Sequence, residues 1–300
     1  FEMCYNLSSI YLESTTPPTA YSPNVFTWLM EGATTFIVDK EAIAAYKASS
    51  VWERYNIYCE EELVDYTYTD GYDVTWTYRY VYSNSSVRIV KIEGYSTDID
   101  APATLPWKEQ QLPVTVIEHS FSGDKNLVSV DLSKTSIITT PSFSYCSSLE
   151  TVLLPSTLES IGDYAFAGNE WNYEECNKLA SIEIPASVKS IGEGAFQYCR
   201  NLNSIDLSKV ETIGDYAFRE ACIISADLSS ATSIGYNAFN YNRDGSIEPF
   251  FKINNTTPAT LKSGAFPSNS MFLVPGSAIT DYKTANVWSD YASRIFGSDV

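Results

Sequence analysis

Apolar and polar residues follow two short patterns that recur through the middle of the chain. In the first, two apolar positions flank one polar residue, as in Ile205-Asp206-Leu207. Alternation with a period of two predicts a short β-strand with one buried face. The second pattern is Ile-Gly-x-x-Ala-Phe, in which the glycine indicates a tight turn or a close approach of two backbones. Its Ala and Phe are expected to point inward as a small and a large side chain.

The second pattern returns almost letter for letter. It reads SIGDYAF at 160–166, SIGEGAF at 190–196, TIGDYAF at 212–218 and SIGYNAF at 233–239. A catalytic motif has no reason to occur so often, whereas a unit that stacks on copies of itself does. Because one unit cannot bury its own apolar face and stacked units can, the repeat predicts a solenoid. The phenylalanines that anchor the copies lie 22, 23, 30, 22 and 21 residues apart, a period typical of leucine-rich repeats: Phe121, Phe143, Phe166, Phe196, Phe218 and Phe239.

One stretch carries the whole repeat frame, LASIEIPASVKSIGEGAFQYC at 179–199. It resembles the BspA-type leucine-rich repeat of bacterial surface proteins, and the resemblance covers about 114–266 of the chain. It implies a β-rich leucine-rich-repeat solenoid, a right-handed superhelix with short helical or 3-10 turns. It also implies a secreted or surface-anchored bacterial protein, with an extracellular or cell-surface location and a role in adhesion. A fold by itself does not establish a function.

Two segments outside the repeats match each other. FIVDKEAIAAYKASSVWERY at 36–55 and FLVPGSAITDYKTANVWSDY at 272–291 place Ile, Tyr, Trp and Tyr at the same mutual spacing. An Ile and a Tyr three residues apart lie on one helix face. Each segment therefore predicts a short helix and a Trp-bearing turn. Such a pair would cover the open end of a solenoid, where core and strand edges are otherwise exposed.

This match predicts the domain organisation. We expect 1–58 to be the last coil and C-terminal cap of a first leucine-rich-repeat domain, whose earlier coils would precede Phe1. Residues 59–113 would be a linker and the β-hairpin cap of a second domain, 114–266 its repeats and 267–300 its C-terminal cap. Asp70-Gly71 is a hairpin turn signal. The strand that follows places four aromatic side chains on one face, either packed on the first coil or exposed as a platform for a sugar or peptide: Trp76, Tyr78, Tyr80 and Tyr82.

The composition of the chain limits the classes of partner that it can bind. The 300 residues hold 19 Lys and Arg against 37 Asp and Glu, a net charge of −18. Coulomb repulsion then argues against nucleic acid and anionic membrane as partners, and no apolar run is long enough to insert into a membrane. The charge suits either simple solubility or a basic partner. Oligomeric state is left open.

The sequence gives little support for a catalytic function. His119 is the single histidine, at a repeat position otherwise filled by unrelated side chains, which indicates a tolerant outward site. None of the six cysteines forms a C-x-x-C pair, and the chain has no phosphate-binding loop. We expect no catalytic residue, no metal site and no cofactor. Four cysteines follow a repeat phenylalanine and predict a buried column of reduced thiols, whereas Cys59 and Cys176 fall outside the pattern: Cys4, Cys146, Cys199 and Cys222.

The outward residue of each predicted strand is the main candidate for binding. These residues are Asp131, Leu153, Glu183, Asp206 and Asp227, beside a column of Ser and Thr. Because the strands line the concave side of a solenoid about 4.8 Å apart, the acids would form a stripe. The stripe is either a solvated polar face or a site for a basic ligand or a Ca²⁺-bridged glycan.

We therefore predict a non-enzymatic, adhesin-like module for protein or glycan binding. It would bind a host or microbial extracellular protein or glycan through the concave strand face or through an insertion at 168–176. The insertion contains Trp171 and Tyr173. These two side chains either form an exposed anchor for a partner or pack as part of the local core. The candidate ligand-binding residues are Asp131, Glu183, Asp206, Asp227, Trp171 and Tyr173. The alternatives are a structural spacer of a larger surface protein and, less favoured, a carbohydrate-active enzyme.

Overall fold

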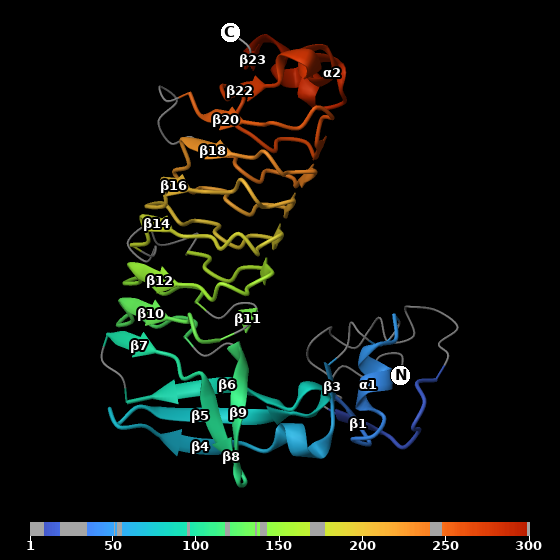
Figure 1. Ribbon diagram of the computed structural model, residues 1–300, viewed down its shortest axis with the longest axis vertical. Helices are drawn as coiled ribbons and strands as arrows, with labels where there is room; N and C mark the ends of the chain where they lie inside the picture. The colour runs from blue at the N-terminus through green and yellow to red at the C-terminus, as the bar shows by residue number, and fades with distance from the viewer. Residues whose placement is uncertain are drawn as a thin grey trace. The chain divides into compact units, whose positions relative to one another are not determined.

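The computed structural model divides into two compact units (Figure 1). The smaller unit comprises 1–68, 77–88 and 104–113, and the larger comprises 69–76, 89–103 and 114–300. Each unit is described by itself. The residues whose structure is described are 9–18, 35–50, 52, 56–94, 97–117, 121–135, 137–138, 143–168, 178–240 and 248–298.

The larger unit is a β-solenoid whose coils contribute short strands to two parallel ladders. The labels of the first ladder run along the left edge of the column in Figure 1. It contains β7 (Asp98–Asp100), β10 (Ser129–Asp131), β12 (Thr151–Leu153), β14 (Ser181–Ile182), β16 (Ser204–Ile205), β18 (Ser225–Asp227), β20 (Phe250–Lys252), β22 (Met271–Val274) and β23 (Ile295–Gly297). Its strands pair in three successive sheets, β7-β10-β12, β14-β16 and β18-β20-β22-β23. The second contains β9 (Gln110–Ile117), β11 (Ile137–Ile138), β13 (Ser160–Ile161), β15 (Ser190–Ile191), β17 (Thr212–Ile213), β19 (Ser233–Ile234) and β21 (Thr260–Leu261).

The second ladder is an addition to what the pattern predicted. The alternating residues predicted one strand per coil, and these form the first ladder. The Ser-Ile or Thr-Ile before each repeat glycine forms another strand, which pairs with its copies in the neighbouring coils. Two residues are too few to show an alternation, so only pairing in the folded chain reveals this strand.

A continuous stack of phenylalanine rings forms the core of the larger unit. Successive ring centroids lie 5.0, 5.4, 5.2, 5.3, 5.1 and 5.2 Å apart, with neighbouring planes 3–14° from parallel. The prediction that these side chains are inward rungs is confirmed, and the stack extends one coil further than the anchors predicted, to Phe266. Its members are all buried: Phe121, Phe143, Phe166, Phe196, Phe218, Phe239 and Phe266.

The repeat glycines mark places where neighbouring coils touch through backbone alone. A Cβ added to Gly214 would lie 2.6 Å from the carbonyl carbon of Gly192 and 2.7 Å from the amide nitrogen of Glu193. The amide of Gly214 donates to the carbonyl of Ile191 at 2.8 Å. The predicted close approach of backbones is therefore confirmed, because any side chain here would separate the coils.

The residue two positions after each repeat glycine adopts a left-handed backbone. Its φ is +56° at Tyr164, +57° at Gly194, +58° at Tyr216 and +51° at Asn237. This conformation is rare for a residue as bulky as Tyr. Here it points the amide at the next coil, where Tyr216 donates to the carbonyl of Tyr236 at 2.8 Å. The position tolerates different side chains, as the sequence indicated, but it requires this backbone.

The predicted thiol column is confirmed for two cysteines and wrong for a third. Cys146 and Cys199 are buried, and each Sγ donates to the carbonyl of a phenylalanine in the previous coil, at 3.0 and 3.1 Å. Burial raises the pKa of the Cys146 thiol to about 12. Cys222 is exposed instead, because Ala221 takes the equivalent buried position. Cys4 and Cys176 lie outside the described residues.

The C-terminal end of the larger unit is covered as predicted. It consists of η4 (Gly276–Ala278), α2 (Ile279–Thr284) and η5 (Trp288–Arg294), which precede β23. The indole nitrogen of the buried Trp288 donates to the carbonyl of Ala259 at 2.7 Å, and its ring packs edge-on against Phe272 and Tyr282. The cap is thus fixed both by aromatic packing and by a hydrogen bond to the coil before it.

The smaller unit contains a second copy of this arrangement. Strands β1 (Ser9–Leu12), β2 (Thr35–Val38) and β3 (Asn56–Tyr58) pair in parallel, and α1 (Ile43–Lys47) lies between β2 and β3 in the chain. Trp52 packs edge-on against Phe36 and Tyr46, and its indole nitrogen donates to the carbonyl of Pro18 at 3.1 Å. The predicted short helices at the two ends are therefore both present.

The remaining strands belong to the predicted hairpin region. They are β4 (Tyr66–Thr69), β5 (Thr75–Val81), β6 (Ser86–Glu93) and β8 (Thr104–Trp107), with the short helices η1 (Glu60–Leu63) and η2 (Tyr82–Asn84) beside them in the chain. The aromatic residues of β5 do not form an exposed platform, because Trp76, Tyr78 and Tyr80 are buried. Within the smaller unit, Tyr80 stacks on Trp107 with ring centroids 4.1 Å apart.

Candidate interaction site

The predicted acidic stripe exists as an outward column on the first ladder. Asp131 lies opposite Asp100 on one side and Leu153 on the other, and Glu183 and Asp206 directly follow their strands and are exposed. Asp227 lies opposite Lys252. The column is therefore acidic at its centre, and Asp100 and Lys252 are members that the sequence pattern did not identify.

Three of the four acids in the stripe also hold their own turns. The carboxylate of Asp131 accepts the amide of Ser133 at 2.8 Å, and Asp206 accepts that of Ser208 at 2.8 Å. Asp227 accepts the amide of Ser229 at 2.9 Å. Each acid begins an Asp-Leu-Ser triplet, a signal visible in the sequence. Such Asx turns close the strand locally, so these acids have a structural task besides any contact with a ligand.

For two of these acids, Asp131 and Asp227, the hydrogen bonds favour the ionised carboxylate. The hydrogen bond from Ser133 holds the pKa of Asp131 below its usual value. Burial alone would raise the pKa of Asp227, but bonds from Ser229 and Lys252 lower it overall. Lys252 lies 3.1 Å from the Asp227 carboxylate and neutralises it. A cationic partner would therefore find free negative charge at the N-terminal and central part of the stripe rather than at Asp227.

A groove of about 550 Å³ opens at the N-terminal end of the stripe, wholly within the larger unit. Its floor is apolar, formed by the buried Ile99 and Val130 of β7 and β10 and by Val74 and Trp76 after the hairpin turn. At its rim, Tyr72 is 89% exposed and Leu153 is 50% exposed. We call this the hairpin groove; its lining includes four carboxylates: Asp70, Asp98, Asp100 and Asp131.

The carboxylates of the hairpin groove are held by short hydrogen bonds. Asp98 accepts the hydroxyls of Ser129 at 2.5 Å and Thr97 at 2.8 Å, and these bonds lower its pKa. Asp100 pairs with Lys134 at 2.6 Å. With one ammonium against four carboxylates, the groove is anionic at neutral pH. Of this lining, the sequence pattern identified Asp131 and Leu153 and, in the neighbouring outward column, Ser129 and Thr151. It did not identify Tyr72, Asp98 or Asp100, because these residues lie outside the repeat frame.

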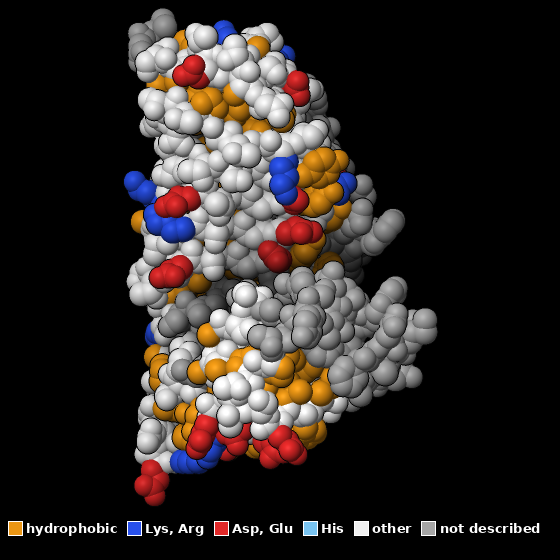
Figure 2. Space-filling view, turned by 90° about the vertical axis from the view of Figure 1, so that its right-hand side faces the viewer, with side chains coloured by type: hydrophobic (Ala, Val, Ile, Leu, Met, Phe, Trp, Pro, Cys, Tyr) orange, Lys and Arg blue, Asp and Glu red, His pale blue; other side chains and the backbone are white. Residues whose placement is uncertain are grey.

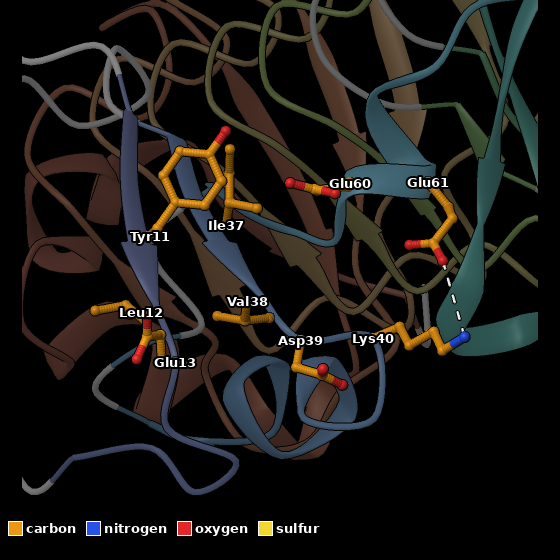
Figure 3. A pocket seen from close by; sticks show the side chains of 9 residues that line it. All are labelled: Tyr11, Leu12, Glu13, Ile37, Val38, Asp39, Lys40, Glu60 and Glu61. Atoms are coloured by element: carbon orange, nitrogen blue, oxygen red, sulfur yellow. Dashed lines mark ion pairs between the residues drawn. The ribbon is translucent and has the colours of Figure 1, made fainter.

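The smaller unit has a groove of similar size, about 550 Å³ (Figure 3). Tyr11 of β1 lies beside Ile37 of β2, and Glu60 of η1 extends toward them from across the groove. Tyr11 is 65% exposed, whereas Ile37 is buried. We call this the cap groove. Its lining also has four carboxylates and one lysine, Glu13, Asp39, Glu60, Glu61 and Lys40, and Lys40 lies 3.9 Å from Glu61.

The second ladder presents a different surface. Figure 2 views the molecule from the side on which Figure 1 labels β11, and acidic, basic and hydrophobic side chains lie interspersed over the coils there. Asp215 accepts the amide of Tyr236 at 2.7 Å and pairs with Lys262 at 2.9 Å. Such pairing leaves this face less uniformly charged than the first ladder.

The remaining candidates are placed as follows. Trp171, Tyr173 and His119 lie outside the described residues. Among the residues that the structure describes, no three His, Cys, Asp or Glu side chains group so as to hold a metal ion, and no helix is long and apolar enough to cross a membrane.

The parallel ladders, the stacked phenylalanines and the terminal cap define a leucine-rich-repeat solenoid. The model of the BspA type leucine rich repeat region, in six copies, matches residues 114–246 and 169–268, and the chain belongs to this family. Comparison with curated proteins gives no match.

Three solved bacterial structures are similar to the chain. A leucine-rich repeat protein from Bacteroides capillosus is 28% identical, with a TM-score of 0.39 over 46% of this chain and 96% of that one. The leucine-rich repeat protein of T. pallidum is 21% identical, with a TM-score of 0.44 over 57% and 89%. A leucine-rich cell surface protein from Faecalibacterium prausnitzii is 16% identical, with a TM-score of 0.26 over 78% and 95%.

Proposed function

We propose that this protein is a non-enzymatic, adhesin-like interaction module at a bacterial cell surface. It binds an extracellular protein of a host or of another microbe through the outward face of the first ladder. The observation that carries the proposal is the hairpin groove, where an apolar floor and ionised carboxylates meet at one end of that face. Apolar pockets with a few convergent polar groups are the usual form of binding sites.

Family membership supports this proposal over catalysis. Repeat folds present extended surfaces built from neighbouring coils. Hydrolysis of a glycosidic bond would need a pair of carboxyl groups of which one has a raised pKa and acts as the acid. The shifted carboxyl pKa values in the hairpin groove are lowered instead, at Asp70, Asp98 and Asp131. Lowered values suit permanent anions that attract a cationic surface.

The test is binding of the purified chain to an array of extracellular matrix proteins, mucins and glycans, at low and high salt. We expect specific protein hits that weaken as salt rises, because screening reduces attraction between exposed charges. The variant Asp131→Asn, Glu183→Gln, Asp206→Asn should lose most of that binding. Asn retains an oxygen that can accept the turn amide, so the fold is expected to persist.

A matched control removes three exposed acids elsewhere: Glu159→Gln, Glu211→Gln, Asp290→Asn. If both variants reduce binding equally, bulk charge rather than the strand face is responsible. If the folded chain gives no hit of any kind on the array, the proposal fails and the spacer function is favoured. Hits on glycans alone would shift the proposal to carbohydrate recognition.

A further inference from the structure

The hairpin groove and the cap groove share their chemistry, although they lie in different units and arise from unrelated stretches of sequence. Each encloses about 550 Å³. Each is lined by four carboxylates, and in each one carboxylate pairs with one lysine, Asp100 with Lys134 and Glu61 with Lys40. Each also has one strongly exposed tyrosine at its edge, Tyr72 or Tyr11.

The two grooves also share their construction. In both, adjacent parallel strands contribute apolar residues to the lining, Ile99 and Val130 from β7 and β10 in one and Tyr11 and Ile37 from β1 and β2 in the other. In both, a segment outside the ladder supplies the opposite wall. That wall is the turn at 70–74 in the hairpin groove and η1 in the cap groove. A floor of strands favours an extended ligand, whose side chains alternate between floor and solvent.

The charges and the floor together select the ligand. Among the described residues, the other three carboxylates of each groove form no ion pair with a lysine. A ligand with positive charge is therefore favoured by Coulomb attraction. Lys and Arg side chains combine a cationic head with an aliphatic stem that packs on apolar or aromatic surface. An exposed tyrosine can also lie against a guanidinium or ammonium group.

We infer that each groove binds an extended, basic segment of a partner protein, so that one chain takes two such segments. The inference rests on the proposed function and deepens it, because it names the class of partner and the number of sites. The hairpin groove places Asp98 and Asp131 against the basic side chains, and the cap groove places Glu13 and Glu60 against them.

The probe is a blocked ten-residue peptide of alternating Lys and Val, with a peptide of alternating Glu and Val as its control. Isothermal titration of the full chain should give two peptides per chain for the basic probe and no binding for the acidic one. The association constant should fall about threefold or more between 50 and 300 mM NaCl, as expected for partly exposed charges.

Variants separate the two grooves. Asp98→Asn with Asp131→Asn should reduce the stoichiometry to one, and so should Glu13→Gln with Glu60→Gln. The combined variant should bind no peptide, while the control pair Glu159→Gln and Glu211→Gln should still bind two. Circular dichroism and unfolding by urea check that each variant remains folded.

A stoichiometry of one or zero for the wild-type chain overturns the inference, as does equal binding of the acidic peptide. A neutral oligosaccharide that competes for both grooves would also overturn it and would identify the ligand as a glycan. If the array of extracellular proteins gives specific hits but the basic peptide does not bind, only this inference fails. If neither binds, the proposed function fails with it.

Discussion

At the scale of single residues, the repeat is constrained by backbone contacts between coils rather than by side-chain chemistry. Gly192, Gly214 and Gly235 allow one coil to touch the next, and the following left-handed residue directs its amide at the neighbouring coil. A residue can therefore be essential to the repeat without any functional role. The recurring residues of the repeat thus have a structural role. The acids of the grooves, which are the candidates for binding, lie mostly outside the repeat frame.

The glycine contact leads to a first prediction, for Gly214→Ala. The added Cβ would meet backbone atoms of Gly192 and Glu193 that cannot move separately from their coil. We expect a loss of about 2–3 kcal/mol in the free energy of unfolding, as for overpacked cores, measured by urea denaturation.

Gly123→Ala is the matched control for this prediction. Gly123 has a φ of +79° and nothing within 4 Å of an added Cβ, so only backbone strain is introduced. That variant should lose about 1 kcal/mol. Equal losses for the two variants would mean that coil contact is not the reason for the glycine.

Asp70 gives a second prediction at this scale, for stability against pH. Its carboxylate accepts the amides of Tyr72 at 2.8 Å and Val74 at 3.1 Å and the indole of Trp76 at 2.9 Å. Burial would raise the pKa of Asp70, but these bonds lower it overall. The stabilisation is therefore present above the unfolded-state pKa of about 3.9 and is lost as pH falls through the lower folded-state value.

We expect Asp70→Asn to be about 1–2 kcal/mol less stable than the wild type at pH 7, since a charged hydrogen bond is lost. The difference should shrink as pH falls below about 3, measured by urea denaturation at each pH. Asp73→Asn, in the same turn, is the control and should show little effect at either pH. A difference that persists unchanged at low pH would contradict this account of the turn.

At the scale of elements, the two caps repeat each other in detail. Tyr46 Oη donates to the carbonyl of Ser14, 32 residues away, and Tyr282 Oη donates to that of Asn255, 27 residues away. The indoles of Trp52 and Trp288 bond to carbonyls 34 and 29 residues before them. For the Tyr bond and for the Trp bond alike, the separation along the chain is five residues longer in the smaller unit than in the larger one. The five extra residues lie between Pro18 and Thr35. We propose on this basis that 9–58 form a terminal coil and its cap.

The cap proposal predicts that Trp52→Phe and Trp288→Phe have similar effects. Each change removes an indole donor and leaves a carbonyl without its bond, at a cost of about 1–2 kcal/mol beyond the lost contact area. Unfolding of the full chain followed by near-UV circular dichroism measures the loss.

Trp107→Phe is the control, because among the described residues Trp107 Nε1 has no hydrogen-bond partner. It should cost less than either cap variant. If Trp52→Phe is as mild as this control while Trp288→Phe is not, the two ends are not equivalent caps.

At the scale of the whole molecule, each coil of the larger unit contacts mainly its neighbours. The phenylalanine stack joins the coils from Phe121 to Phe266 with nearly constant spacing. Stability in such proteins is a sum over repeats and their interfaces. The chain has a net charge of −18, and eight of its described carboxylates line the two grooves, four in each.

The sequence by itself determined the solenoid, its inward rungs and the matching helix and Trp-bearing turn near each end. Repetition gives each coil the same environment, so the role of Phe196 or Gly214 can be inferred from its copies. It did not predict the second ladder, because two-residue strands show no periodicity. Nor did it predict the exposure of Cys222, which follows its repeat phenylalanine by four residues rather than three, so that Ala221 takes the buried position.

Only the tertiary structure decided where the grooves lie. Residues such as Tyr72, Asp98 and Asp131 are far apart in the chain and belong to a turn and two separate coils. Their convergence depends on how a turn that occurs once in the chain folds against the first strands. It cannot be inferred from the repeats, because none of them contains that turn. The physical reason is that a repeated pattern encodes contacts between like elements, whereas a binding site forms where unlike elements meet.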